Sequence, residues 1–222
     1  MANILCFGDS NTWGTPPAKT AIVLPNSQSR YSSNERWTGL LHQALKHSYQ
    51  VVEEGQPSRT LVHNSPFDGD KTGIRYLKNC LEQYSPQLTI IMLGTNDLKN
   101  KYALCAKQIG QGLSTLVKQA QNFIVLNTNI ATKILLICPP TIDEVGHYAK
   151  MYAGGAEKSK QLAQHYQQCA NELNCTFVDA NTIITSSKED GVHWPVDQHQ
   201  LFANALLPII KKLINHEDLQ RI

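Results

Sequence analysis

The stretch that decides the fold is NILCFGDSN, residues 3–11. Asn3–Phe7 is a short, mainly apolar run, and it is followed by Gly8, Asp9 and Ser10, residue types that favour turns. An apolar run of this length that stops at turn residues predicts a buried strand. The stretch therefore places a serine hydroxyl just beyond the carboxyl end of a strand.

Strand-sized apolar runs alternate with helical patterns along the rest of the chain. In Arg36–His47, Trp37, Leu40, Leu41 and Ala44 recur at the spacing of one helix face. The predicted strands are Asn3–Phe7, Tyr49–Val52, Leu88–Leu93, Lys133–Cys138 and Thr176–Val178. The predicted helices are Arg36–His47, Lys71–Tyr84, Ala103–Asn122, Gly155–Leu173 and Val196–Ile214.

This alternation predicts βαβ units, which close right-handed into a parallel sheet covered on both faces. We expect a three-layer α/β/α sandwich with a five-stranded parallel sheet, flavodoxin-like, built as a single domain over residues 1–222. Its ligand site should lie at the carboxyl ends of the strands.

The composition of the chain argues against several classes of protein. The chain has 222 residues, 20 Lys+Arg against 18 Asp+Glu, and 17% charged residues, so no basic field attracts nucleic acid. The longest apolar stretches, such as Leu88–Leu93, are far shorter than a membrane span. The six cysteines are widely spaced, which favours reduced thiols in a cytoplasmic protein over disulfides or zinc ligands. We expect no metal, no cofactor, and neither nucleic-acid nor membrane partners; homo-oligomerisation stays open.

The predicted strand ends bring chemistry-bearing residues to one edge. Ser10 follows the first strand, Gly55 the second and Asn96 the third, while Asp190 and His193 come after the fifth. A hydroxyl, an exposed backbone amide, a side-chain amide and a carboxylate–imidazole pair are the groups that acyl transfer needs.

The roles follow from chemistry. A serine hydroxyl is a weak nucleophile, so it needs a neutral imidazole to take its proton, and His193 is the candidate. Asp190 can hold that imidazole in one tautomer if Gly191 allows a tight turn. Three donors are available for the oxyanion: the backbone N–H groups of Ser10 and Gly55 and the side-chain amide of Asn96.

These blocks resemble the SGNH (GDSL-type) hydrolase superfamily in order and over nearly the whole chain. The resembling segments are Gly8-Asp9-Ser10-Asn11, Gly55, Gly94-Thr95-Asn96-Asp97 and Asp190-Gly191-Val192-His193. The added segments Trp13-Gly14, Arg36-Trp37-Thr38-Gly39, Glu53-Glu54 and Arg59-Thr60 look like the arylesterase/acyltransferase branch. The resemblance implies a cofactor-free serine esterase of small acyl esters, with Ser10 as nucleophile, His193 as base, Asp190 orienting it, and Gly55 and Asn96 as oxyanion donors.

Other residues have both a structural and a functional interpretation. Trp13 and Trp194 flank the nucleophile and the base in sequence, so they are either core aromatics or walls of a substrate pocket; Asn11 is a further candidate for substrate binding. His199 is interpreted as a packing or supporting residue, and Arg59 as a structural ion-pair partner. The loops 12–35, 58–70 and 141–154 match no usable motif.

The favoured function is therefore a serine esterase that hydrolyses, or transfers, short acyl groups of small or aryl esters through an acyl-enzyme on Ser10. A carbohydrate deacetylase, or a lysophospholipase or thioesterase of the same superfamily, is the alternative. A non-catalytic, flavodoxin-like binding module is the distant third.

Overall fold

The computed structural model describes residues 1–18, 29–64, 69–127 and 132–215. Within these residues the chain alternates strands and helices, as the sequence predicts. The strands are β1 Ala2–Gly8, β2 Tyr49–Gly55, β3 Leu88–Met92, β4 Lys133–Cys138 and β5 Thr176–Asp179. The α-helices are α1 Ser10–Trp13, α2 Trp37–Leu45, α3 Gly73–Tyr84, α4 Ala106–Asn127, α5 Gly155–Glu172 and α6 Val196–Asn215. Short 3₁₀ helices occur at Asn96–Leu98, Asn100–Tyr102, Gly146–Tyr148 and Ala180–Thr182.

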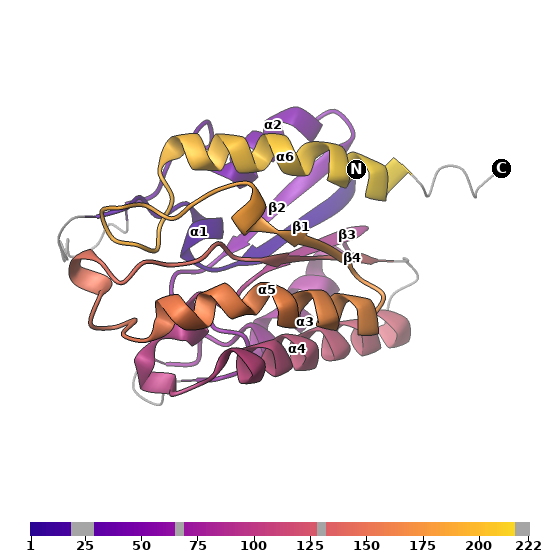
Figure 1. Cartoon of the computed structure of the whole chain (residues 1–222). Helices are drawn as coiled ribbons and strands as arrows, with labels where there is room; N and C mark the ends of the chain where they lie inside the picture. The colour runs from indigo at the N-terminus through magenta and orange to yellow at the C-terminus, as the bar shows by residue number, and fades with distance from the viewer. Residues whose placement is uncertain (19–28, 65–68, 128–131, 216–222) are drawn as a thin grey trace.

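The five strands form one parallel sheet in the order β2-β1-β3-β4-β5. The register pairs Gly8 at the end of β1 with Gly55 of β2 on one side and with Met92 of β3 on the other. The strand order reverses direction at β1, which is where ligands bind in open parallel sheets. The helix α1, which follows β1 and begins at Ser10, therefore lies at this point of the carboxyl edge of the sheet (Figure 1).

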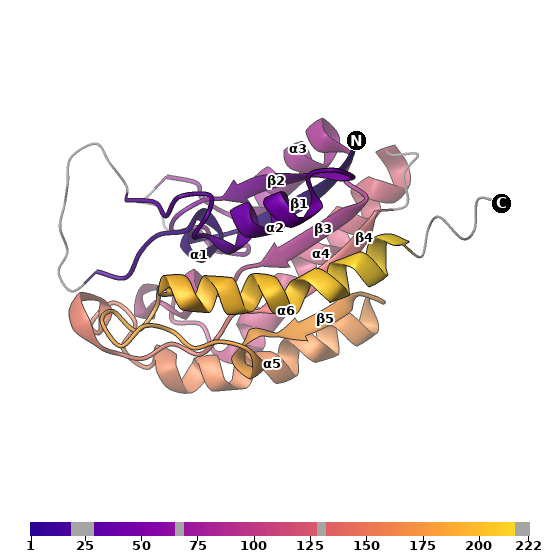
Figure 2. The same ribbon diagram turned by 90° about the horizontal axis from the view of Figure 1, so that it is seen from above.

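Helices cover both faces of the sheet. Figure 1 shows α2 and α6 on one side and α3, α4 and α5 on the other, and Figure 2 shows α2 and α6 side by side across the sheet. The alternation of side chains along β1 serves both layers, because Leu5 and Phe7 pack in the core under α3–α5 while Ile4 and Cys6 pack in the core under α2 and α6. The predicted three-layer sandwich is confirmed.

Two features next to the site differ from the prediction. The predicted β2 ends at Val52, but the strand continues to Gly55 because Glu53 is neutralised by Arg36, 2.6 Å away, and Glu54 accepts a hydrogen bond from Tyr84. The predicted loop begins at residue 12, whereas α1 occupies Ser10–Trp13. Four residues are too few to give a helical period in the sequence.

Two of the long loops lie only in part within the described residues, since 19–28 and 65–68 fall outside them. The loop 141–154 is described throughout. Among the described helices, none combines the length and the apolar character required to cross a bilayer.

Candidate active site

Ser10 is the first residue of α1, and only Asp9 separates it from the end of β1 at Gly8. The side chain of Asp9 caps this helix by accepting a hydrogen bond from the Asn11 backbone N–H at 3.0 Å. Because the first amides of a helix have no acceptor within the helix, the Ser10 N–H is left available at the edge of the sheet. The nucleophile and one predicted oxyanion donor therefore belong to the same residue.

The structure brings His193 against Ser10 although they are 183 positions apart. The Nε2 atom of His193 lies 3.0 Å from Ser10 Oγ, and its Nδ1 atom lies 2.8 Å from Asp190 Oδ2. Ser10 is 7% exposed and His193 5% exposed, so both are largely shielded from water while each keeps some access. The three predicted triad residues form one continuous hydrogen-bonded chain.

The surroundings of Asp190 decide the tautomer of His193. Burial raises the pKa of the Asp190 carboxyl, but hydrogen bonds from the His193 side chain and from backbone amides outweigh burial and leave this pKa below its ordinary value. Asp190 is therefore ionised near neutral pH and can only accept hydrogen bonds. It follows that Nδ1 of His193 carries the proton, and that Nε2 presents its lone pair to the Ser10 hydroxyl.

Asn96 comes to this edge from the 3₁₀ turn after β3, and its amide is held on both sides. Its Nδ2 donates to the Arg59 carbonyl at 3.1 Å, and its Oδ1 accepts from the Tyr152 hydroxyl at 3.3 Å. Since an amide nitrogen carries two hydrogens, the second N–H of Asn96 is available to a ligand.

Arg59 connects Asn96 to the nucleophile turn. Its guanidinium donates to the Gly8 carbonyl at 3.0 Å and also to the Glu54 carbonyl and the Gln56 side chain. The expected ion pair is therefore wrong: Arg59 binds carbonyl oxygens and no carboxylate among the described residues. Its role is to fix the loop after β2 against the end of β1.

The orientation of Gly55 argues against the predicted oxyanion role. The N–H of Gln56 donates to Gly8 O at 3.1 Å, and successive amides of an extended strand point to opposite sides, so the Gly55 N–H points away from β1. Packing explains why position 55 is a glycine. A Cβ at Gly55 would lie 2.2 Å from the Trp13 backbone nitrogen. Glycine at 55 lets α1 pack on β2; it does not open the site to substrate.

Ser58 is a residue in this region that sequence reasoning did not single out. Its φ is +68°, a left-handed conformation that is unusual for a residue with a side chain, and it immediately precedes Arg59. Strained backbone of this kind concentrates at functional sites. The sequence signal was weak: Pro57-Ser58 indicates a turn and nothing more.

Two of the three predicted substrate contacts are misplaced. Trp194 is fully buried in the core with Phe202, at a centroid distance of 5.1 Å, so it is a core aromatic and no pocket wall. Asn11 is 1% exposed, and its side chain donates to the Val192 carbonyl, 3.2 Å away, so it faces protein rather than substrate. A single sequence cannot distinguish an aromatic or an amide that faces a cleft from one that faces the core.

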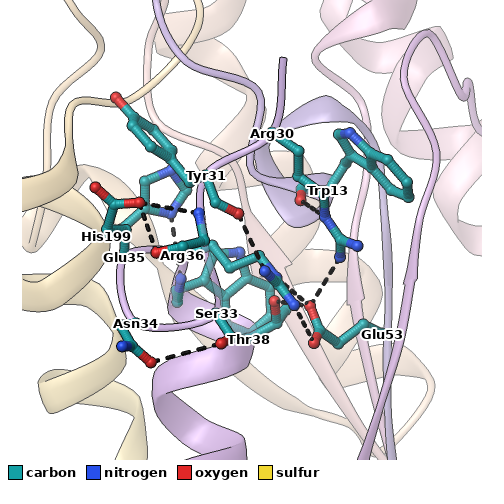
Figure 3. A network of polar contacts seen from close by, with 12 residues as sticks. Trp13, Arg30, Tyr31, Ser33, Asn34, Glu35, Arg36, Thr38, Glu53 and His199 are labelled. Atoms are coloured by element: carbon teal, nitrogen blue, oxygen red, sulfur yellow. Dashed lines mark hydrogen bonds and ion pairs between the residues drawn. The ribbon is translucent and has the colours of Figure 1, made fainter. Parts of the chain in front are cut away.

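Trp13 is partly buried, and Arg30 stacks on it (Figure 3). The Arg30 Cζ lies 3.9 Å from the indole centroid, and its Nε donates to the Trp13 carbonyl at 2.7 Å. Whether Trp13 contacts substrate stays a prediction.

In the polar network of Figure 3, the Glu53 carboxylate accepts hydrogen bonds from three side chains. Its carboxylate accepts from Arg36 at 2.6 and 2.8 Å, from Arg30 at 3.0 Å and from Thr38 at 2.6 Å. Burial raises the pKa of Glu53, but the hydrogen bonds and charges of its partners lower it by more. The network attaches the segment around 30–38 to the end of β2, beside α1.

The loop 141–154, whose role the sequence leaves open, supplies aromatic side chains to the site. Tyr152 donates to Asn96, as described above, and the Tyr148 ring lies 5.6 Å from the His193 ring. Burial raises the pKa of Tyr152 well above its ordinary value, so its hydroxyl keeps the proton that it donates.

His199 is buried beneath the site and has the supporting position that the sequence suggests. Its Nδ1 accepts from the Trp37 backbone N–H at 3.4 Å, and burial, together with the charge of His193, lowers its pKa to about 4. His199 is therefore neutral near pH 7.

In the described part of the chain, no cluster of three or more His, Cys, Asp or Glu side chains is arranged to hold a metal ion. The site described here consists of hydroxyl, imidazole, carboxylate and amide groups.

The chain is similar in sequence and in structure to known proteins. Residues 4–206 match the family described as GDSL-like Lipase/Acylhydrolase. The M. smegmatis aryl esterase has a similar structure, with 32% identity, a TM-score of 0.88, and coverage of 96% of this chain and 100% of that one. A carbohydrate acetylesterase from Sinorhizobium meliloti is similar at 32% identity and a TM-score of 0.86, with the same coverage. A search of curated proteins gives no significant match.

Proposed function

The chain belongs to the GDSL-like lipase/acylhydrolase family, and from this membership we propose that it cleaves short acyl esters through a covalent acyl-enzyme on Ser10. It is an esterase, an enzyme that acts on carboxylic ester bonds. The acyl-enzyme, the short acyl group and the role of each residue are the proposal.

One observation carries the assignment of roles: His193 makes hydrogen-bond contacts with Ser10 Oγ at 3.0 Å and with Asp190 Oδ2 at 2.8 Å at the same time. A serine, an imidazole and a carboxylate in this order are the arrangement that activates a serine hydroxyl.

In the first half-reaction, Ser10 Oγ attacks the ester carbonyl carbon while Nε2 of His193 takes the hydroxyl proton. The imidazolium that forms is stabilised by the ionised Asp190. The carbonyl oxygen becomes an anion, which accepts hydrogen bonds from the Ser10 N–H and the free N–H of Asn96, each donor contributing about 2.7–4 kcal/mol. The C–O bond to the alcohol then breaks, and the alcohol leaves with the proton from Nε2.

In the second half-reaction, water gives a proton to Nε2 and attacks the acyl carbon. Ser10 Oγ leaves and takes that proton back, which releases the carboxylic acid. A second alcohol in place of water gives a new ester by the same steps. The shielding of Ser10 and His193 keeps both charged intermediates in a site with little water, where the donors act most strongly.

For a third oxyanion donor, the loop after β2 supports Ser58 better than Gly55. The Asn96 side chain donates to the carbonyl of Arg59, so the neighbouring Ser58 is held close to Asn96. Its left-handed backbone also distinguishes it from the regular strand that ends at Gly55.

A second candidate is deacetylation of carbohydrates. The specific observation in its favour is the similar structure of the Sinorhizobium meliloti carbohydrate acetylesterase, at the same identity as the aryl esterase. Both candidates use the same triad and differ only in the alcohol part of the substrate.

The test compares turnover of an aryl acetate by the wild type and by Ser10→Ala. We expect the variant to lose nearly all activity, while its thermal unfolding stays close to that of the wild type. Full activity of Ser10→Ala would refute the proposal. Acetyl, butyryl and octanoyl esters of one alcohol then define the acyl group, and an acetylated sugar measured beside the aryl acetate separates the two candidates.

A further inference from the structure

The turn that carries His193 is fixed by its backbone carbonyls. Three consecutive carbonyl oxygens each accept a hydrogen bond from a different part of the chain. Gly191 O accepts from the Asp143 N–H at 2.9 Å, Val192 O from the Asn11 side chain at 3.2 Å, and His193 O from the Ser187 N–H at 2.9 Å. Only the middle contact joins this turn to the helix of the nucleophile.

Asn11 is itself held firmly. Its backbone N–H donates to Asp9, its backbone carbonyl accepts from the Trp37 indole N–H at 3.1 Å, and its side chain is 1% exposed. The amide has one chemically allowed orientation, because only Nδ2 can donate to the Val192 carbonyl. Its other end, Oδ1, is buried and has no hydrogen-bond partner among the described residues.

An unpaired buried amide oxygen destabilises a fold, so a plain packing role does not explain an asparagine here. The Nδ2 contact does explain it. Asn11 follows Ser10 directly, and Val192 precedes His193 directly, so this one hydrogen bond joins the neighbours of the two groups between which the proton moves. The Ala18 N–H also donates to Asp190 Oδ2, at 3.3 Å, but Ala18 lies beyond the end of α1 and does not belong to the helix of the nucleophile.

We propose that Asn11 is a positioning residue: its side-chain amide holds the His193 turn at the distance from α1 that keeps Nε2 in hydrogen-bond contact with Ser10 Oγ. This proposal rests on the proposed function, since it assigns a role in the same site. Asn11 touches neither substrate nor reacting atoms, and it acts through Val192.

The test uses two asparagines near opposite ends of β1 as a matched pair. Asn3 also donates from Nδ2 to a distant backbone carbonyl, that of Tyr84 at 2.5 Å, but away from the site. We expect Asn11→Leu to lower kcat for an aryl acetate roughly 10- to 100-fold, because a shift of about 1 Å in a catalytic group has effects of this size. KM should change by no more than about twofold, since substrate binding is not altered. Asn3→Leu should keep the wild-type kcat, whatever its effect on the melting temperature.

Two further measurements make the result decisive. The rate of Ser10 phosphonylation by a fluorophosphonate should fall in parallel with kcat, because both reactions need His193 beside Ser10. Asn11→Ala removes the same donor without adding an apolar branch, and it replaces Asn11→Leu if that variant does not fold.

Wild-type kcat in a folded Asn11 variant would overturn the proposal, and so would an equal loss in Asn3→Leu. These outcomes are distinct from failure of the proposed function. In that case the wild type itself would show no turnover that depends on Ser10.

Discussion

Gly191 and Asp143 lie against each other so closely that a side chain at 191 has no room. The Asp143 N–H donates to Gly191 O at 2.9 Å, and a Cβ built on Gly191 would lie 1.9 Å from Asp143 O. Gly191 also has a φ of +73°. The turn that presents Asp190 and His193 together therefore depends on glycine for both its conformation and its contact.

The first prediction concerns this turn. Gly191→Ala should lower the free energy of unfolding by about 3 kcal/mol and reduce kcat strongly, because strain and the clash with Asp143 displace His193. Gly154→Ala is the matched control. Gly154 has a similar φ of +78°, but nothing lies within 4 Å of its would-be Cβ, so only about 1 kcal/mol should be lost. Urea unfolding measures the free energy of unfolding of both variants. Equal losses in Gly191→Ala and Gly154→Ala would show that the contact with Asp143 has no effect.

The second prediction separates the two adjacent carboxylates. Asp190→Asn should lower kcat by up to about 10⁴-fold, because the amide no longer fixes the tautomer in which Nε2 accepts the serine proton. Glu189→Gln should leave kcat within about twofold of the wild type. Steady-state kinetics with an aryl acetate measures both variants. The reverse pattern would move the orienting role to Glu189.

Most of the fold was predictable because the chain carries regular apolar patterns. β4 begins and ends where the sequence predicts, and β1, β3 and β5 differ from prediction by one residue at one end or at both. The end of β2 is predicted wrongly for a physical reason. Two consecutive glutamates indicate the end of a strand, and the partners that stabilise Glu53 and Glu54, Arg36 and Tyr84, are distant in the sequence. The local sequence pattern cannot predict ion pairs and hydrogen bonds between residues that are distant in the sequence.

The order of residues at the site was predictable for a similar reason. In a parallel sheet the strand ends meet at one edge, so Ser10, Asn96 and His193 could be brought together from sequence alone. The contacts that decide finer roles were not predictable. The direction of the Gly55 amide and the burial of Trp194 and Asn11 depend on how distant elements pack, and no single stretch of sequence encodes them.

The third prediction concerns stability in acid. His199 has a pKa of about 4 in the folded protein against an ordinary value of 6.5. The unfolded chain therefore binds a proton that the folded protein does not, and stability falls as the pH drops from 6.5 to 4. His199→Gln removes this titration, so the wild type should lose roughly 3 kcal/mol relative to the variant across that range.

Comparison with the variant is needed because Asp9 acts in the opposite direction. Burial raises the pKa of Asp9 from 3.8 to about 6, so the folded protein binds a proton that the unfolded chain does not. The stabilisation that this proton gives is lost as the pH rises from about 4 to about 6. Asp9 is present in both proteins and cancels in the difference. Urea unfolding at pH 4 to 7 gives both curves, and parallel curves would show that His199 does not titrate as described.

The fourth prediction concerns the network around Glu53. Glu53→Gln weakens the hydrogen bonds from Arg30 and Arg36, which are only partly exposed, so the free energy of unfolding should fall by roughly 1–3 kcal/mol. Glu157→Gln is the control. Glu157 pairs with Lys160 on the surface, and both side chains are exposed, so its loss should stay within about 0.5 kcal/mol. Chemical unfolding measures the free energy of unfolding of both variants. Similar small losses would mean that the Glu53 network stabilises the fold no more than an ordinary surface ion pair does.

The most direct test of the account asks which atom of the protein becomes covalently modified. The wild type is treated with a fluorophosphonate, and its peptides are analysed by mass spectrometry while the remaining esterase activity is followed. We expect one adduct, on Ser10, that forms in step with the loss of activity, and no adduct in His193→Ala on the same timescale. An inactivated enzyme whose adduct lies on another residue, or full labelling of Ser10 without His193, would contradict the account.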